Sequence, residues 1–135
     1  MTSATATTYA HAALRIVSGF LFFQHGYPKL FGRLPGSGEG EAAREFLSIF
    51  WVSGFLEVVG GLLIMIGLFT RPAAFLVAGE MAVAYFWRHL PQGFWPGSNR
   101  GELAALYCFV FLYLAAAGAG IWSLDGVVRR RAERP

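Results

Sequence analysis

Four long apolar stretches, separated by short segments rich in glycine, proline and charge, dominate this sequence. They run over residues 9–30, 46–69, 72–88 and 102–122. A helix needs roughly 20 residues, at a rise of about 1.5 Å each, to cross the hydrocarbon core of a bilayer. Three stretches have that length, and the third reaches it if Pro72 begins the helix and Arg88 extends to the headgroups. The pattern predicts an all-α protein, a four-transmembrane-helix antiparallel bundle forming one domain over residues 1–135.

The composition supports a membrane environment. Hydrophobic residues make up 56% of the chain and charged residues 14%, whereas soluble domains carry about 25% charged residues. The basic residues form no stripe that would suit nucleic acid, and the arginines of the tail over residues 123–135 instead indicate the side that faces the cytoplasm. An even number of spans then predicts that both termini are cytoplasmic, in an inner or plasma membrane, with the lipid bilayer as the main partner.

The cysteine count excludes several redox chemistries. Cys108 is the only cysteine, so the chain has no disulfide pair, no CxxC motif and no all-cysteine iron–sulfur site. His25 and His89 would be the candidates for haem ligation, but they lack matching depth, which argues against haem. The sequence predicts no metal site.

The first stretch carries a polar face. Arg15, His25 and Lys29 recur at helical spacing together with small residues, so they share one side of the predicted helix. Each ionisable group would cost about 2.5–3.5 kcal/mol at the centre of a bilayer. We therefore expect this face to point into the bundle.

Two acids occupy the second and third stretches. Glu57 lies beside Gly60 and Gly61 on a small-residue face that lets another helix approach closely. Counting 1.5 Å per residue from the predicted helix starts places Arg15 and Glu80 at similar depth, about 10 Å from the cytoplasmic side. We therefore predict a structural ion pair between these two. Glu57, near the midplane, is either a group that handles protons or a protonated acid that donates one interhelical hydrogen bond.

The remaining candidates lie toward the opposite surface. Glu102 begins the fourth stretch at about the level of Lys29, and Trp87 ends the third. Together with the charged groups they outline a polar track that is closed at the cytoplasmic end and open toward the other face. The sequence therefore predicts a buried polar pocket there, with Lys29, Arg15, Trp87 and Glu102 as binding residues.

Motifs in several stretches form a recognisable combination. They are Arg15, Gly19, His25-Gly26 and Lys29-Leu30-Phe31-Gly32 in the first, Glu57 through Arg71 in the second, and Glu102 through Tyr107 with Ser123-Leu124-Asp125 in the fourth and beyond. In this combination the chain resembles the DoxX family over nearly its whole length. The resemblance implies a small four-helix membrane protein, named for its likeness to a subunit of thiosulfate:quinone oxidoreductase. It also implies polar family positions at Arg15, His25, Lys29, Glu57 and Glu102.

Three hypotheses of function follow. In the first, the chain is a membrane subunit of a quinone-linked oxidoreductase. His25 and Lys29 would donate hydrogen bonds to a quinone carbonyl, Glu57 would deliver a proton, and a membrane or peripheral redox partner would supply electrons. In the second, the polar core is structural and the chain is a membrane scaffold. In the third, Arg15, Lys29 and His25 bind an anion or weak acid for transport, although no proline lies at mid-depth of a predicted span. The small-residue surfaces of the second and fourth stretches suggest a homodimer.

Overall fold

The structure is a computed structural model that describes residues 2–38 and 42–132. Every regular element within these residues is helical, which confirms the all-α prediction. The elements are α1 (Ser3–Phe31), α2 (Ile49–Ile66), α3 (Thr70–Ala84), the π-helix η1 (Tyr85–His89), the 3₁₀-helix η2 (Leu90–Gln92), α4 (Pro96–Asn99), α5 (Glu102–Ala117) and α6 (Leu124–Ala132).

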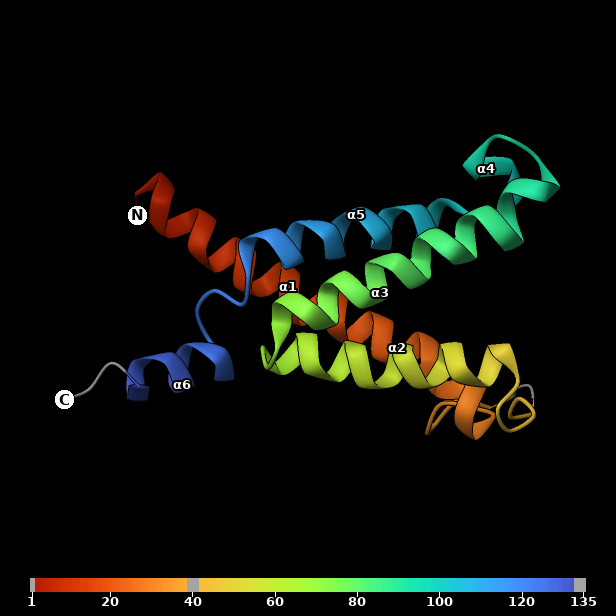
Figure 1. Ribbon diagram of the computed structural model, residues 1–135, viewed down its shortest axis with the longest axis horizontal. Coiled ribbons are helices and arrows are strands. Elements are labelled where there is room, and N and C mark those ends of the chain that lie inside the picture. Colours follow the sequence, from red (N-terminus) through yellow and green to blue (C-terminus); the bar gives the residue numbers. More distant parts are fainter. Residues whose placement is uncertain (1, 39–41, 133–135) are drawn as a thin grey trace.

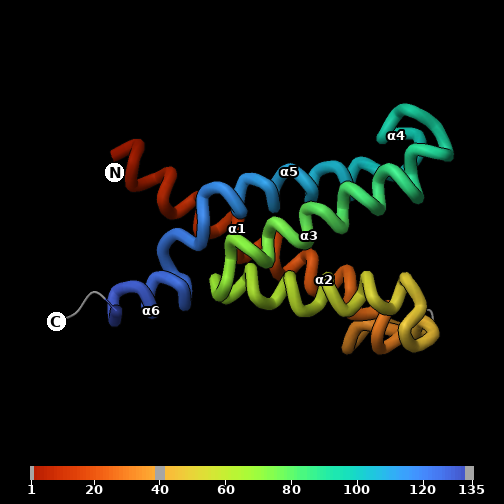
Figure 2. Tube along the Cα trace, in the orientation of Figure 1, coloured from red at the N-terminus to blue at the C-terminus, as the bar shows by residue number. Residues whose placement is uncertain are grey.

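The long helices form two antiparallel hairpins. The first hairpin is α1 with α2, and the second is α3 with α5 (Figure 1). The trace shows that α1 begins, and α6 lies, at one end of the molecule, while the α1–α2 connection and α4 lie at the other (Figure 2). A tight turn joins the hairpins: Gly67 ends α2 in the left-handed region with φ 70°, a conformation that glycine adopts without steric cost.

Helix boundaries differ from the predicted spans at both ends of the chain. α1 begins at Ser3, where Thr2 caps it by accepting a hydrogen bond from the Thr5 amide. α5 ends at Ala117 instead of residue 122, because Gly118 has φ 84° and the Arg71 guanidinium binds the Ala116 carbonyl at 2.6 Å. Both features terminate a helix.

Helix length bears on how the chain meets a membrane. By length and composition, α2 alone among the described helices qualifies as a candidate span. α5 has 16 residues and is therefore about 24 Å long. α3 continues without a break in the chain into η1, and the two together extend about 30 Å.

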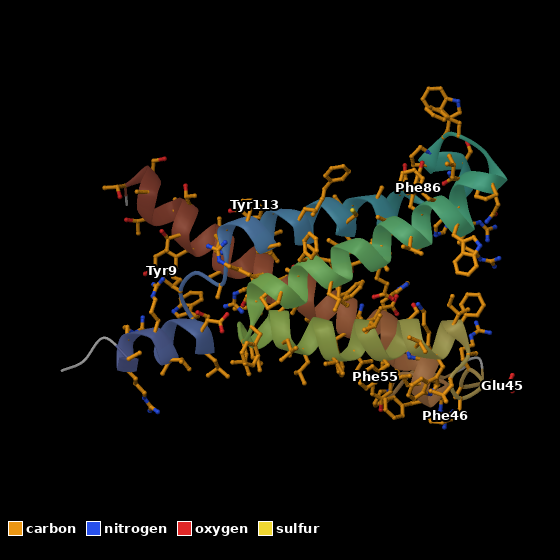
Figure 3. All side chains as sticks on the ribbon, viewed as in Figure 1. Tyr9, Glu45, Phe46, Phe55, Phe86 and Tyr113 are labelled. Carbon is orange, nitrogen blue, oxygen red and sulfur yellow. The ribbon has the colours of Figure 1, made fainter. Side chains whose placement is uncertain are left out.

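The packed interior lies where the hairpins meet. The rings of Phe22, Tyr107 and Phe111 pack together, with the Phe22 and Phe111 centroids 4.8 Å apart. Outside this core, large apolar side chains such as Phe55 and Phe86 point away from the bundle (Figure 3). Arg15 and Glu57, in contrast, are 0% exposed. Charge inside and exposed aromatic side chains outside are the distribution expected of a protein surrounded by lipid.

Glycines allow α1 and α2 to touch through their backbones. A Cβ added to Gly19 would lie 2.8 Å from the Gly61 carbonyl oxygen, and one added to Gly26 would lie 2.7 Å from that of Gly54. Gly60 packs against Val77 of α3. The small-residue face of α2 is thus used within the chain. It does not supply the homodimer surface that the sequence suggested.

The first turn of α6 caps α3. The Asp125 carboxylate accepts hydrogen bonds from the Phe69 and Thr70 amides at 2.8 and 2.9 Å. These are backbone donors at a helix N-terminus, where a carboxylate also interacts favourably with the helix dipole.

Replacing Asp125 with alanine is expected to lower the free energy of unfolding by about 1–2 kcal/mol, the usual cost of a lost N-cap. Titration with SDS in mixed micelles, followed by circular dichroism, measures this change. Glu45→Ala is the matched control, because that carboxylate is exposed (Figure 3). Equal stability of the two variants would show that the cap contributes nothing.

Candidate functional site

Five polar residues from three helices meet in the half of the bundle near the α1–α2 connection. We call them the lysine cluster, which consists of His25 and Lys29 from α1, Ser53 and Glu57 from α2, and Glu80 from α3. The predicted convergence of His25, Lys29 and Glu57 is therefore seen in the structure.

The centre of the cluster is an ion pair. Lys29 Nζ donates hydrogen bonds to Glu57 Oε1 at 2.7 Å and to Ser53 Oγ at 3.0 Å. The Glu57 side chain is 0% exposed and that of Lys29 is 23% exposed. A charged group at this depth needs an opposite charge, because the surrounding low dielectric penalises an isolated one. The pair accordingly gives the buried Glu57 carboxyl group a basic partner from the neighbouring helix.

Local sequence explains how the pair forms. His25 and Lys29 are four residues apart on α1, as are Ser53 and Glu57 on α2, so each pair lies on one helix face. The glycines bring these faces together: a Cβ added to Gly54 would lie 2.6 Å from Lys29 Cβ. Ser53 was not among the predicted site residues. Its spacing from Glu57 is the signal in the sequence that identifies it.

His25 lies at the outer edge of the cluster. Its side chain is 47% exposed, and Nε2 is 3.9 Å from Glu57 Oε1. This distance is too long for a direct hydrogen bond but short enough for a bridging ligand or water. His25 is thus the ionisable group that connects the buried carboxylate with the surroundings of the bundle.

Glu80 approaches the same centre from α3. Both of its carboxylate oxygens are buried, and neither has a hydrogen-bond partner among the described residues. Glu57 and Lys29 lie within electrostatic range of this carboxyl group, and the Ser53 hydroxyl is close to it. Glu57 Oε2 is likewise buried and unpartnered in the described part of the chain.

Arg15 occupies a separate position near the other end. Its guanidinium donates five hydrogen bonds to backbone carbonyl oxygens at 2.6–3.2 Å. The acceptors are Ile64 and Met65 at the end of α2, and Ala119, Ile121 and Trp122 after α5. A guanidinium has five N–H donors, so no donor remains for a substrate or a transported anion. This geometry gives Arg15 a structural role at the helix ends, and its predicted role in binding stays a prediction.

The predicted ion pair between Arg15 and Glu80 is wrong. Arg15 lies level with the end of α2, close to the turn where α3 begins at Thr70. Glu80 is ten residues further along α3, which separates it from that level by about 15 Å. The prediction failed because it assumed that α1 and α3 begin at the same level. In the structure α1 begins twelve residues before Arg15, and Arg15 is itself level with the start of α3.

Two further predicted binding residues lie outside the lysine cluster. Trp87 is 66% exposed on η1, which suits a side chain at a lipid boundary. Glu102 is exposed at the start of α5 and lies beside Gly97 of α4. The structure brings neither of them to Lys29 or Glu57.

A cavity among the described residues lies elsewhere than the predicted buried pocket. It is an open hollow of about 470 Å³ between the end of α1 and the following loop. Its lining residues are Tyr27, Phe31, Arg33, Leu34, Pro35, Gly36 and Ser37. Within the described residues, no three histidine, cysteine or acidic side chains are grouped as a metal site would require.

Comparison with known proteins places this geometry in a family. The DoxX family model matches residues 10–90, which include every residue of the lysine cluster. The chain is 44% identical over 120 residues to an uncharacterized protein of Haemophilus influenzae, covering 87% of this chain and 89% of that one. It is 31% identical over 138 residues to an uncharacterized membrane protein of Mycobacterium tuberculosis, covering 88% and 81%. No solved structure matches.

Proposed function

Because the chain belongs to the DoxX family of membrane proteins, we propose that it is the membrane subunit of a quinone-linked oxidoreductase system. The observation that carries this proposal is the lysine cluster: a buried Lys29–Glu57 ion pair with a half-exposed His25 beside it. Intramembrane ionisable groups are expensive and commonly mark a functional site.

The proposal includes a membrane arrangement. α1, α2, α3 with η1, and α5 would be the four spans, with both termini on the cytoplasmic side of an inner or plasma membrane. Arg71 and the α6 arginines lie at the end of the bundle where α1 begins. Three arginines follow one another in α6, whereas those at the other end are spread over separate segments, and a dense basic segment favours the cytoplasm for its side. The lysine cluster would then face the other half of the bilayer.

The chemistry of the donors suits a quinone as substrate. A quinone carbonyl accepts hydrogen bonds, and the Lys29 ammonium and the His25 ring can provide them. Reduction of a quinone to a hydroquinone consumes two electrons and two protons, one proton at each carbonyl oxygen. Carboxyl groups at the cluster can hold and pass a proton, while a membrane or peripheral redox partner supplies both electrons. Cys108 alone forms no dithiol that would donate them.

One observation supports a second function. All five Arg15 donors are used to hold the helix ends together, so part of the polar interior is structural. A scaffold that assembles with other membrane proteins needs such an interior and no substrate. In that case Lys29 and Glu57 would also serve only to join α1 to α2.

Quinone binding separates the two functions. Protein purified from native membranes is expected to carry a quinone that organic solvent extracts and chromatography identifies. Lys29→Met should weaken binding of a short-chain ubiquinone or menaquinone analogue by roughly 10-fold or more, since a hydrogen bond to a charged group is worth about 1.5–3 kcal/mol. Quenching of tryptophan fluorescence measures the binding.

Arg88→Met is the control, because it removes an exposed positive charge outside the cluster. It should bind the analogue as the unmodified protein does. If no quinone is extracted and Lys29→Met binds the analogue with unchanged affinity, the quinone function is refuted and the scaffold function remains.

A further inference from the structure

The lysine cluster has more negative groups than positive ones. Glu57 and Glu80 would contribute two negative charges if both were ionised, against one positive charge from Lys29. His25 is half-exposed and is not required to carry charge. A net negative charge at this depth is unfavourable in a low dielectric. Neutrality requires that the two carboxyl groups hold one proton between them.

The hydrogen bonds distinguish the two carboxyl groups. Glu57 Oε1 accepts a hydrogen bond from Lys29 at 2.7 Å and lies 3.5 Å from the Ser53 hydroxyl. These donors stabilise a carboxylate. The oxygens of Glu80 are buried without a hydrogen-bond donor in the described part of the chain, and a buried carboxylate without donors is strongly disfavoured relative to the neutral acid.

The other polar groups near Glu80 come from α1, α2 and α5. α1 contributes His25 and Lys29, and α2 contributes Ser53 and Glu57. α5 contributes Tyr107, a neutral phenol within electrostatic range of Glu57. Lys29 is thus the one fixed positive charge among these groups, and it is already bonded to Glu57.

We propose that Glu80 is a neutral carboxylic acid at pH 7, and that Lys29, Glu57 and Glu80 together bind one exchangeable proton. A protonated Glu80 can donate its O–H, and Glu57 Oε2 is a buried acceptor that lacks a donor among the described residues. A proton lost from Glu80 to a bound acceptor would leave the site with one excess negative charge. That charge would be removed by uptake of a proton past His25, the partly exposed group beside Glu57.

The proposed function needs a proton donor, and this inference identifies that donor as Glu80. It rests on the proposed function only for the acceptor that receives the proton. The protonation state itself requires no substrate. It is therefore measurable in the full chain without a quinone or a redox partner.

Infrared spectroscopy of the protein in lipid vesicles at pH 7.5 tests the proposal. A protonated carboxyl group gives a C=O stretching band, which moves to lower frequency in D₂O if its proton exchanges. Exposed aspartates and glutamates are ionised at this pH and do not contribute. We expect one such band in the unmodified protein. Its absence would overturn the proposal without any variant.

Substitutions identify the carboxyl group that gives the C=O band. Glu80→Gln is expected to abolish it, whereas Glu102→Gln, which alters an exposed carboxyl group, should leave it unchanged. Glu80→Asp should shift the band, because aspartic and glutamic acids absorb at different frequencies, and Glu57→Asp should not. A band that persists in Glu80→Gln, or that shifts in Glu57→Asp instead, would place the proton elsewhere and refute the assignment. Glu80→Asp retains the carboxyl group and remains informative if Glu80→Gln does not fold.

Charge counting gives a second test. In Lys29→Met the positive charge is lost, so both carboxyl groups should be protonated and the band intensity should rise about twofold. In Glu57→Gln, Lys29 needs Glu80 as its counter-charge, so the band should disappear. Unchanged intensity in both variants would show that the cluster does not share one proton.

The quinone experiment and the infrared experiment test separate claims, so one can fail while the other succeeds. Loss of the expected quinone together with the expected band pattern would refute the proposed function and leave Glu80 as the proton-binding residue. Quinone binding without the band would refute the Glu80 assignment alone.

Discussion

Replacing Arg15 with leucine is expected to lower the free energy of unfolding by about 3–5 kcal/mol, among the largest effects of any single substitution in this protein. The physical reason is the loss of five charge-assisted hydrogen bonds to the end of α2 and the segment after α5. Unfolding with SDS in mixed micelles, followed by circular dichroism, measures the change. Arg15→Lys should recover only part of the stability, because an ammonium cannot reproduce the geometry of the guanidinium.

Arg88→Leu is the control for removing a positive charge, because Arg88 is exposed. Its stability should remain within about 0.5 kcal/mol of the unmodified protein, as for most surface substitutions. A loss of similar size in Arg88→Leu and Arg15→Leu would contradict the role of the buried hydrogen bonds.

The double variant Arg15→Leu/Glu80→Leu separates the observed contacts from the ion pair predicted from the sequence. If the two side chains paired, removing both would restore much of what either single substitution lost. In the structure Arg15 bonds only to carbonyl oxygens, and Glu80 lies about 15 Å further along the bundle. The two changes in stability should therefore add. Rescue in the double variant would contradict the structure.

Substitution of Gly61 is expected to separate α1 from α2. A Cβ at this position would lie 2.5 Å from the Phe23 amide nitrogen and 2.7 Å from the Gly19 carbonyl oxygen, both of them backbone atoms. Gly61→Ala should therefore lower the free energy of unfolding by about 1–3 kcal/mol, and Gly61→Leu by more. Because the same contact brings Lys29 to Glu57, both variants should also weaken the lysine cluster. The measurements are SDS unfolding and the infrared band intensity.

Gly79→Ala is the matched control within a helix. A Cβ at Gly79 meets nothing within 4 Å, so alanine should be neutral or stabilise α3 by up to about 1 kcal/mol through its higher helix propensity. If Gly79→Ala and Gly61→Ala destabilise equally, the close contact between α1 and α2 does not account for the effect.

The sequence was enough to predict which face of each helix is buried. The face of α1 that carries Arg15 and Lys29 is directed inward, as predicted. The ion pair between Lys29 and Glu57 was not predicted. Helical periodicity specifies such faces directly, and the high cost of charge in lipid decides which side of each helix is buried. The all-helical fold follows from the same pattern.

Contacts made through the backbone could not be predicted. The partners of Arg15 are carbonyl oxygens, which every residue carries, so no sequence pattern distinguishes them. The cap that Asp125 provides for α3 joins segments that are far apart in the chain. Its position depends on where α5 ends, and that end is itself set by Gly118 and Arg71.

The amino-acid sequence by itself determined that this chain forms apolar helices with inward-facing charge, because periodicity and the cost of burying charge act within each helix. Only the tertiary structure decided which charges meet. The level of each side chain along the bundle depends on how its helix is placed against the others, and glycine contacts between helices and the Asp125 cap on α3 set that placement. For this reason Glu80 lies with Lys29 and Glu57, while Arg15 holds the helix ends.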